Sequence, residues 1–339
     1  MHFPAGLHVD EHPPDGGWTT PKAPVVVYVH GSLDRGASFA RVIRRLGGWG
    51  SITYDRRGYL GSRMSPLDGG ASPHAPAPGP PVGSVAGSPT GSHAGSPAGS
   101  PAGSPAGSLD GHIRDLLGVV GALPPGAGPV TAVGHSLGGD VVVGAALEEP
   151  AMFASIAAFE PPMPWLGFRR RPPQRSPQPH LPDAGDRPAD RPDAGAEAER
   201  FFRRMVGDSA WERLPETARQ DRRDDGPALV ADLTSIRGAA PFDVTALTVP
   251  VLFGRSGPGG DEHHRLTVAW LANHVPGAAM MDIEGAGHGA HLSHPDAFAR
   301  FVRRAVEMGA QSRRVPRGER SPGGMHVPEG LSGRTGTSG

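Results

Sequence analysis

Short, almost wholly apolar runs recur along the chain, and most of them end in glycine or in polar residues. The first, PVVVYVHG at 24–31, is rich in β-branched residues, which is typical of a strand buried on both faces. Runs of the same kind occupy 49–58, 129–135, 153–162, 249–254 and 278–285. These runs predict six strands of a buried sheet.

Segments with helical spacing lie between these runs. In the segment 109–123, Leu109, Ile113 and Leu116 fall on one helical face, and the segments 38–48 and 264–275 are also predicted to be helical. Alternation of strand and helix indicates an α/β fold, a mostly parallel, doubly wound sheet with helices on both faces. In such sheets functional groups collect at the carboxyl ends of the strands.

Composition limits how much of the chain can fold. Fifty-one glycines and 39 prolines in 339 residues indicate ordered segments interrupted by disordered, low-complexity ones. We predict one domain at 21–310, with disordered ends at 1–20 and 311–339. A flexible loop at 66–108 contains the repeat SPAGSPAGSPAGS, and the Pro-, Arg- and Asp-rich tract 169–198 is also expected to be disordered.

Charge and residue usage exclude several classes of protein. A net charge of −1 and a pI near 7.0 give no electrostatic footprint for nucleic acid. The absence of cysteine excludes disulfides, thiol nucleophiles and Cys-ligated zinc. No apolar run reaches the roughly 18 residues of a membrane span, so we expect a cytoplasmic protein without a membrane partner. The sequence does not indicate an oligomeric state.

Ser136 lies in the motif GHSLG, between an apolar run and a helical segment. This G-x-S-x-G pattern is typical of a nucleophilic serine on a sharp turn, where glycines allow neighbouring chains to approach. The helix that follows points its backbone N–H groups toward a developing anion. The segment His30–Gly31–Ser32 ends the first strand, and we expect the backbone N–H groups of Ser32 and Leu137 to form an oxyanion hole.

His288 is the preferred general base. It follows the last predicted strand in EGAGHGAHLSHP and comes after the serine in chain order, as in hydrolases with a serine nucleophile. His291 and His294 are its competitors. Three histidines in one segment could suggest a metal site, but no carboxylate is interleaved with them, and the sequence favours no metal.

Together these segments resemble the α/β-hydrolase superfamily, over most of the chain outside the low-complexity tracts. The fragments that carry the resemblance, in order, are VVVYVHGS, ITYDRRGYLGS, AVGHSLGG, SIAAFEPPMPW, VPVLFG and IEGAGHGAHLSHPDAF. The resemblance implies Ser136 as nucleophile, His288 as base, the Ser32 and Leu137 oxyanion hole, and no cofactor. It also implies that the segment 55–58 is structural.

The resemblance further implies a helical cap at 161–240, inserted above the substrate pocket. The segments 201–214 and 226–238 are plausible cap helices. Four apolar cap residues are candidates for the pocket lining, although ordinary core packing explains them equally well. They are Met163, Trp165, Phe168 and Phe202.

The acid that should orient His288 is missing from its usual place. Family members commonly carry an aspartate just after the strand at 249–254, where this chain has Arg255, Ser256 and Gly257. Asp261 is the nearest acid, but it stands directly before a helical segment and is also a natural N-cap. Glu160, at the end of the preceding strand, is the other candidate, and we favour it because a buried carboxylate needs a partner such as histidine.

These residues predict a cofactor-independent serine hydrolase that cleaves a small-molecule ester, or less readily an amide, through an acyl-enzyme. Perhydrolase or carbon–carbon lyase chemistry could use the same triad, because a fold alone does not fix the reaction. The alternative from another functional class is a non-catalytic ligand-binding protein on a hydrolase scaffold. Because the acid is displaced from its usual place, a catalytically impaired site is a third interpretation.

Overall fold

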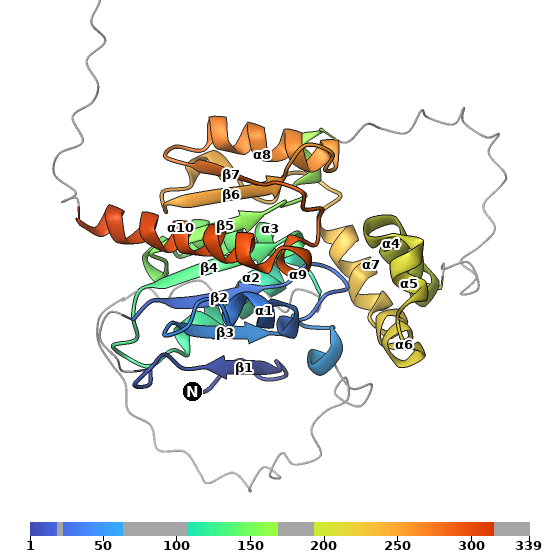
Figure 1. The fold of residues 1–339 in the computed structure, drawn as a ribbon, viewed down its shortest axis with the longest axis horizontal. Helices are drawn as coiled ribbons and strands as arrows, with labels where there is room; N and C mark the ends of the chain where they lie inside the picture. The colour runs from blue at the N-terminus through green and yellow to red at the C-terminus, as the bar shows by residue number, and fades with distance from the viewer. Residues whose placement is uncertain (19–22, 64–106, 169–192, 315–339) are drawn as a thin grey trace, which may run out of the picture.

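The fold is a seven-stranded sheet in the order β1-β3-β2-β4-β5-β6-β7 (Figure 1). The structure is a computed structural model that describes residues 1–18, 23–63, 107–168 and 193–314. All six predicted strands are confirmed, and a seventh precedes them. The strands are β1 (Val9–His12), β2 (Val25–Val29), β3 (Gly50–Tyr54), β4 (Val130–His135), β5 (Ser155–Phe159), β6 (Val251–Ser256) and β7 (Ala279–Ile283).

Strand β1 corrects the prediction that residues 1–20 are disordered. It pairs antiparallel with β3, with Val9 opposite Tyr54 and His12 opposite Ser51, whereas every other strand pair is parallel. Its sequence, VDEH, is mostly polar, and Glu11 and His12 are exposed. A polar edge strand carries little hydrophobic signal, because only one side of it meets the sheet.

Helices cover both faces of the sheet, as predicted. On one face lie α2 (Leu109–Gly121), α3 (Leu137–Glu148) and α8 (Glu262–His274). On the other face lie α1 (Ala40–Ile43), α9 (Ala290–Ser293) and α10 (Pro295–Arg314), with α10 running across several strands in Figure 1. The segment predicted as a helix at 38–48 forms only the short α1 after a 3-10 turn.

Strand β2 lies between two cores. Val25, Val27 and Val29 face the side of α2 and α3, while Val26 and Tyr28 face the side of α10. All five residues are buried. The continuous apolar run in the sequence is therefore explained by a central strand that is covered on both faces.

Four further helices form a cap beyond one end of the strands (Figure 1). They are α4 (Ala194–Val206), α5 (Asp208–Glu212), α6 (Glu216–Asp224) and α7 (Gly226–Ser235). Helix α4 begins inside the tract predicted to be disordered at 169–198, because Asp193 caps it by accepting a hydrogen bond from the Gly195 N–H. Residues 169–192 of that tract lie outside the described residues.

The other tracts predicted to be disordered also meet helices. Residues 66–106 of the predicted repeat loop lie outside the described residues. Ser108, at the end of this loop, caps α2 by accepting a hydrogen bond from the Gly111 N–H at 3.1 Å. The predicted tail at 311–339 begins four residues too early, because α10 runs to Arg314. The rest of that tail lies outside the described residues.

A buried carboxylate joins the cap to the sheet. Asp232 of α7 accepts hydrogen bonds from the Arg56 guanidinium, the Tyr59 hydroxyl, the Ser32 hydroxyl and His112 Nε2. Arg56 and Asp232 are both fully buried, and their closest N–O distance is 2.8 Å. Burial would raise the pKa of Asp232, but the Arg56 and His112 groups lower it well below its ordinary value. The segment 55–58 therefore has a clear structural use.

Candidate active site

Ser136 lies on a strained turn between β4 and α3. Its φ of 53° and ψ of −128° fall in a region that L-residues rarely occupy, at a typical cost of about 1–3 kcal/mol. A Cβ added at Gly134 would lie 2.1 Å from the Gly138 carbonyl oxygen, and one at Gly138 would lie 2.1 Å from that of Val29. Both glycines of the motif are therefore required by close backbone approach.

The loop after β2 passes directly beside Ser136. A Cβ added at Gly31 would lie 2.9 Å from the Ser136 Cβ, so only glycine allows this approach. Ser32 and Leu137 border a small cavity together with Ser136. The loop is held from the cap side, because the Ser32 hydroxyl donates to Asp232 at 2.7 Å. Strands β2 and β4 flank the switch in strand order, where sites form in such sheets.

His288 faces Glu160 across the ends of the strands. Its Nδ1 lies 2.6 Å from Glu160 Oε2, and the His288 side chain keeps 16% of its surface exposed while Glu160 keeps 1%. Glu160 has a φ of 48°, a second strained residue beside Ser136. Strain of this kind concentrates at functional sites.

Ser256 stands where family members commonly carry the acid, and it binds Glu160. It is the last residue of β6, and both its backbone N–H and its hydroxyl donate to Glu160 Oε1, at 2.8 and 2.5 Å. Glu160 thus uses one oxygen for Ser256 and the other for His288. Strand β6, which has no acid at its end, therefore holds the carboxylate that follows the neighbouring strand β5.

The environment keeps Glu160 ionised. Burial alone would raise its pKa, but the hydrogen bond and charge of His288, the charge of His264 and the Ser256 hydroxyl lower the pKa to about 2. His264 stacks on His288 with ring centroids 4.7 Å apart and planes within 9°. Burial and the neighbouring His288 lower the pKa of His264 to about 4, which favours a neutral ring there.

Asp261, the alternative acid, caps α8. It accepts a hydrogen bond from the His264 backbone N–H at 3.3 Å, and its side chain is 61% exposed. The two histidines that competed with His288 have other partners. His291 Nε2 lies 3.1 Å from Asp34, and His294 is hydrogen-bonded to Ser293.

A cavity of about 590 Å³ opens between the sheet and the cap. Ser136 and His288 both line it, as do Ser32 and Asp34 from the loop after β2. The wall from α4 is mainly apolar and includes Phe201, Phe202 and Met205. The candidate nucleophile at the end of β4 and the candidate base in the loop after β7 therefore line the same cavity.

Of the four residues considered for the pocket lining, only Phe202 borders this cavity. Met163 is fully buried in the core on the α3 side, and Trp165 packs against that core with its ring beside Phe242. Phe168 contacts Trp270 of α8. These three residues follow β5 and pack on the sheet side. Ordinary core packing, the alternative that the sequence left open, therefore accounts for them.

A model of the alpha/beta hydrolase family matches residues 26–301. The chain belongs to this family. The match includes strand β4 and helix α3 on either side of Ser136, the cap helices and the loop that carries His288. No curated protein matches the chain.

Solved structures of other alpha/beta hydrolases have the same fold at low sequence identity. The enol-lactonase from Burkholderia xenovorans LB400 is 17% identical, with a TM-score of 0.54 over 89% of this chain and 96% of that one. A thermophilic esterase from Thermogutta terrifontis is 17% identical, with a TM-score of 0.52 and coverages of 89% and 93%. The N-formylmaleamic acid deformylase from Pseudomonas putida S16 is 16% identical, with a TM-score of 0.52 and coverages of 87% and 95%.

Within the described part of this hydrolase, no helix is long and apolar enough to cross a membrane. Two clusters of side chains there have donor atoms close enough to share a metal ion, within 4.8 Å of one another. One consists of Glu160, His264 and His288, and the other of Asp34, His135 and His291. Sequence reasoning missed the second cluster, because its carboxylate and its histidines come from three separate segments.

Proposed function

We propose that this alpha/beta hydrolase cleaves small-molecule carboxylic esters through an acyl-enzyme formed on Ser136, without a cofactor. The observation that carries the proposal is the 2.6 Å contact between His288 Nδ1 and Glu160, on the same cavity as the strained Ser136. A histidine held by a buried carboxylate through one nitrogen has its other nitrogen available as a base.

In the proposed reaction, the Ser136 hydroxyl attacks the ester carbonyl while His288 Nε2 accepts its proton. The tetrahedral oxyanion is stabilised by the backbone N–H groups of Ser32 and Leu137. Collapse releases the alcohol, which takes the proton from His288, and leaves an acyl-Ser136 ester. Water, deprotonated by His288, then attacks this ester and releases the carboxylic acid, and Ser136 recovers its proton. Glu160 stays ionised and holds the imidazole throughout.

The cavity supports a substrate with an apolar acyl group. Phe201, Phe202 and Met205 form an apolar wall from α4 in the same cavity that Ser136 lines. Ester hydrolysis is also in keeping with the enol-lactonase and esterase among the similar structures. A cavity of about 590 Å³ is within the range of small-molecule sites.

Labelling with a fluorophosphonate probe tests the nucleophile. We expect the probe to modify Ser136 in the folded protein and to leave Ser136→Ala unlabelled, while the matched variant Ser209→Ala, at an exposed position on α5, labels normally. The modified residue is located by peptide mass spectrometry.

A panel of p-nitrophenyl esters of graded chain length tests turnover with the same proteins. We expect saturable hydrolysis that is lost in Ser136→Ala and kept in Ser209→Ala. Absence of labelling in a protein with a cooperative melting transition would refute the nucleophile. Saturable ligand binding without turnover across the panel would instead favour a non-catalytic binding protein.

A further inference from the structure

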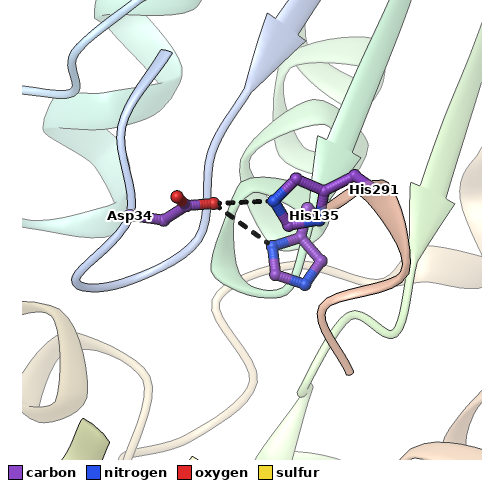
Figure 2. Close-up of side chains that lie close together, drawn as sticks. All are labelled: Asp34, His135 and His291. Atoms are coloured by element: carbon purple, nitrogen blue, oxygen red, sulfur yellow. Dashed lines mark hydrogen bonds and ion pairs between the residues drawn. The ribbon is translucent and has the colours of Figure 1, made fainter. Parts of the chain in front are cut away.

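A second group of polar side chains lies beside Ser136 and takes no part in the proposed reaction. Asp34 comes from the loop after β2, His135 from the end of β4 and His291 from α9. Figure 2 shows the Asp34 carboxylate with both imidazole rings turned toward it. All three residues line the large cavity, although His135 and His291 are themselves buried, with 5% and 1% exposure.

The hydrogen-bonding pattern of His135 leaves one nitrogen unused. Its Nε2 lies 2.8 Å from the His288 carbonyl oxygen, which can only accept, so this nitrogen carries a proton and donates it. Its Nδ1 is buried, has no hydrogen-bond partner, and stands 3.8 Å from Asp34 Oδ2. That separation is too long for a hydrogen bond. A lone pair therefore faces a carboxylate oxygen across a short gap, an arrangement that a cation between them would stabilise.

The three donor atoms lie close enough together to share one metal ion after small side-chain adjustments. His291 Nε2 is 3.1 Å and His135 Nδ1 is 3.8 Å from Asp34 Oδ2, and the three ligand atoms lie within 4.8 Å of one another. Tetrahedral zinc with bond lengths of about 2.0–2.2 Å separates its ligands by roughly 3.3 Å. Imidazole and carboxylate are ligands that Zn²⁺ accepts together, with the fourth position open in catalytic sites.

We propose that Asp34, His135 and His291 bind a divalent transition-metal ion, Zn²⁺ or one of similar preference, on the wall of the cavity that contains Ser136. The fourth ligand position faces the cavity, where water or an oxygen of a bound small molecule completes it. The site is independent of the esterase proposal, because none of its three ligands is the proposed nucleophile, base or acid.

Such an ion would also fix the loop that carries the base. A metal-bound histidine usually donates its other N–H to an oxygen, which sets the ring orientation. His135 already makes this bond to the His288 carbonyl. Binding at His135 Nδ1 would therefore hold His135, and through it the backbone of His288, in the orientation seen in the structure.

Zinc titration of chelator-treated protein tests the proposal, with isothermal calorimetry as the measurement. We expect one tight site in the full chain, and an affinity lowered by more than about 100-fold in Asp34→Asn and in His291→Asn, since even outer-sphere partners contribute 10- to 100-fold. The matched control is His264→Asn, which breaks the other cluster and should leave the titration unchanged. Titration with Co²⁺ gives a second readout, because ligation changes its visible absorption spectrum.

The other cluster must be distinguished, since Glu160, His264 and His288 also lie within ligand distance. Loss of the tight site in His264→Asn, with retention in Asp34→Asn, would place the ion there and overturn the proposal. A full chain that binds neither Zn²⁺ nor Co²⁺ would overturn it as well. Melting curves in chelator show whether each variant is folded, and a zinc-dependent rise in melting temperature that persists in folded Asp34→Asn and His291→Asn would also count against the site.

Discussion

Two buried carboxylates, Glu160 and Asp232, contact a histidine in different surroundings. Each lies within 2.9 Å of an imidazole nitrogen, and each has a pKa held below its ordinary value by its partners despite burial. Asp232 is surrounded by donors from the sheet side and its histidine, His112, is 1% exposed. The partner of Glu160, His288, opens to the cavity with Ser136. The same contact joins structural elements in one place, whereas in the other it leaves one face of an imidazole open to the cavity, as the proposed base requires.

Glu160→Gln tests the reactive side of this comparison and should have the largest effect. The amide keeps the shape of the side chain but cannot compensate an imidazolium, so we expect a loss of up to about 10⁴-fold in kcat, as for the orienting acid of serine proteases. The measurement is p-nitrophenyl ester hydrolysis under saturating substrate.

Asp261→Asn is the matched control for Glu160→Gln, because it removes the alternative acid in the same way. Asp261 is exposed and caps α8, so we expect full turnover and a cost of no more than about 1 kcal/mol in stability. The reverse result, with turnover lost only in Asp261→Asn, would assign the acid to Asp261. Full activity in both variants would remove both acids from the mechanism.

Asp232→Asn tests the structural side. The variant leaves the Arg56 guanidinium buried without its counter-charge, and breaking a buried pair in this way typically costs about 3–5 kcal/mol. We expect a loss of that size in the free energy of unfolding measured with urea. Asp296→Asn is the control, since its ion pair with Arg45 lies at the surface, is screened by solvent and should contribute far less than the buried pair. Equal losses in the two variants would contradict the anchoring role of Asp232.

The two carboxylates also show which features of the structure can be predicted from the sequence and which cannot. The strands were predictable because β2 and β5 are buried on both faces and read as continuous apolar runs. Glu160 could be favoured from its place at the end of β5. Its second partner could not, because the Ser256 hydroxyl reaches it across 96 positions of chain and no local pattern marks that contact.

Other features lay beyond sequence reasoning for similar reasons. Asp34 meets His291 across 257 positions, so the carboxylate that is absent between the histidines of the segment 284–295 comes from the other end of the domain. Met163 and Phe202 are both apolar cap-region residues, yet one is core and the other lines the cavity. Hydrophobicity predicts burial, whereas the choice between core and cavity depends on tertiary packing.

The contribution of Glu160 to the free energy of unfolding should depend on pH. The pKa of Glu160 is lowered from 4.5 to about 2. The ionised carboxylate therefore stabilises the folded state at pH values above 4.5, and this contribution is lost as the pH falls toward 2. We expect the difference in unfolding free energy between the wild type and Glu160→Gln to shrink by about 3 kcal/mol between pH 5 and pH 2. A difference that stays constant over this interval would show that Glu160 is not held ionised by its partners.

Ser256→Ala tests what holds Glu160 in place and should have a smaller effect than the changes at Glu160 and Asp232. It removes the hydroxyl that donates to Oε1 but keeps the backbone N–H at 2.8 Å. Hydrogen bonds to charged groups contribute about 1.5–3 kcal/mol, so we expect a stability loss in that range, against almost none for the exposed hydroxyl in Ser293→Ala. Because the hydroxyl lowers the pKa of Glu160, its removal should also move the acid transition of the preceding experiment to higher pH. An unchanged transition would mean that the other partners of Glu160 keep the carboxylate ionised without help from the Ser256 hydroxyl.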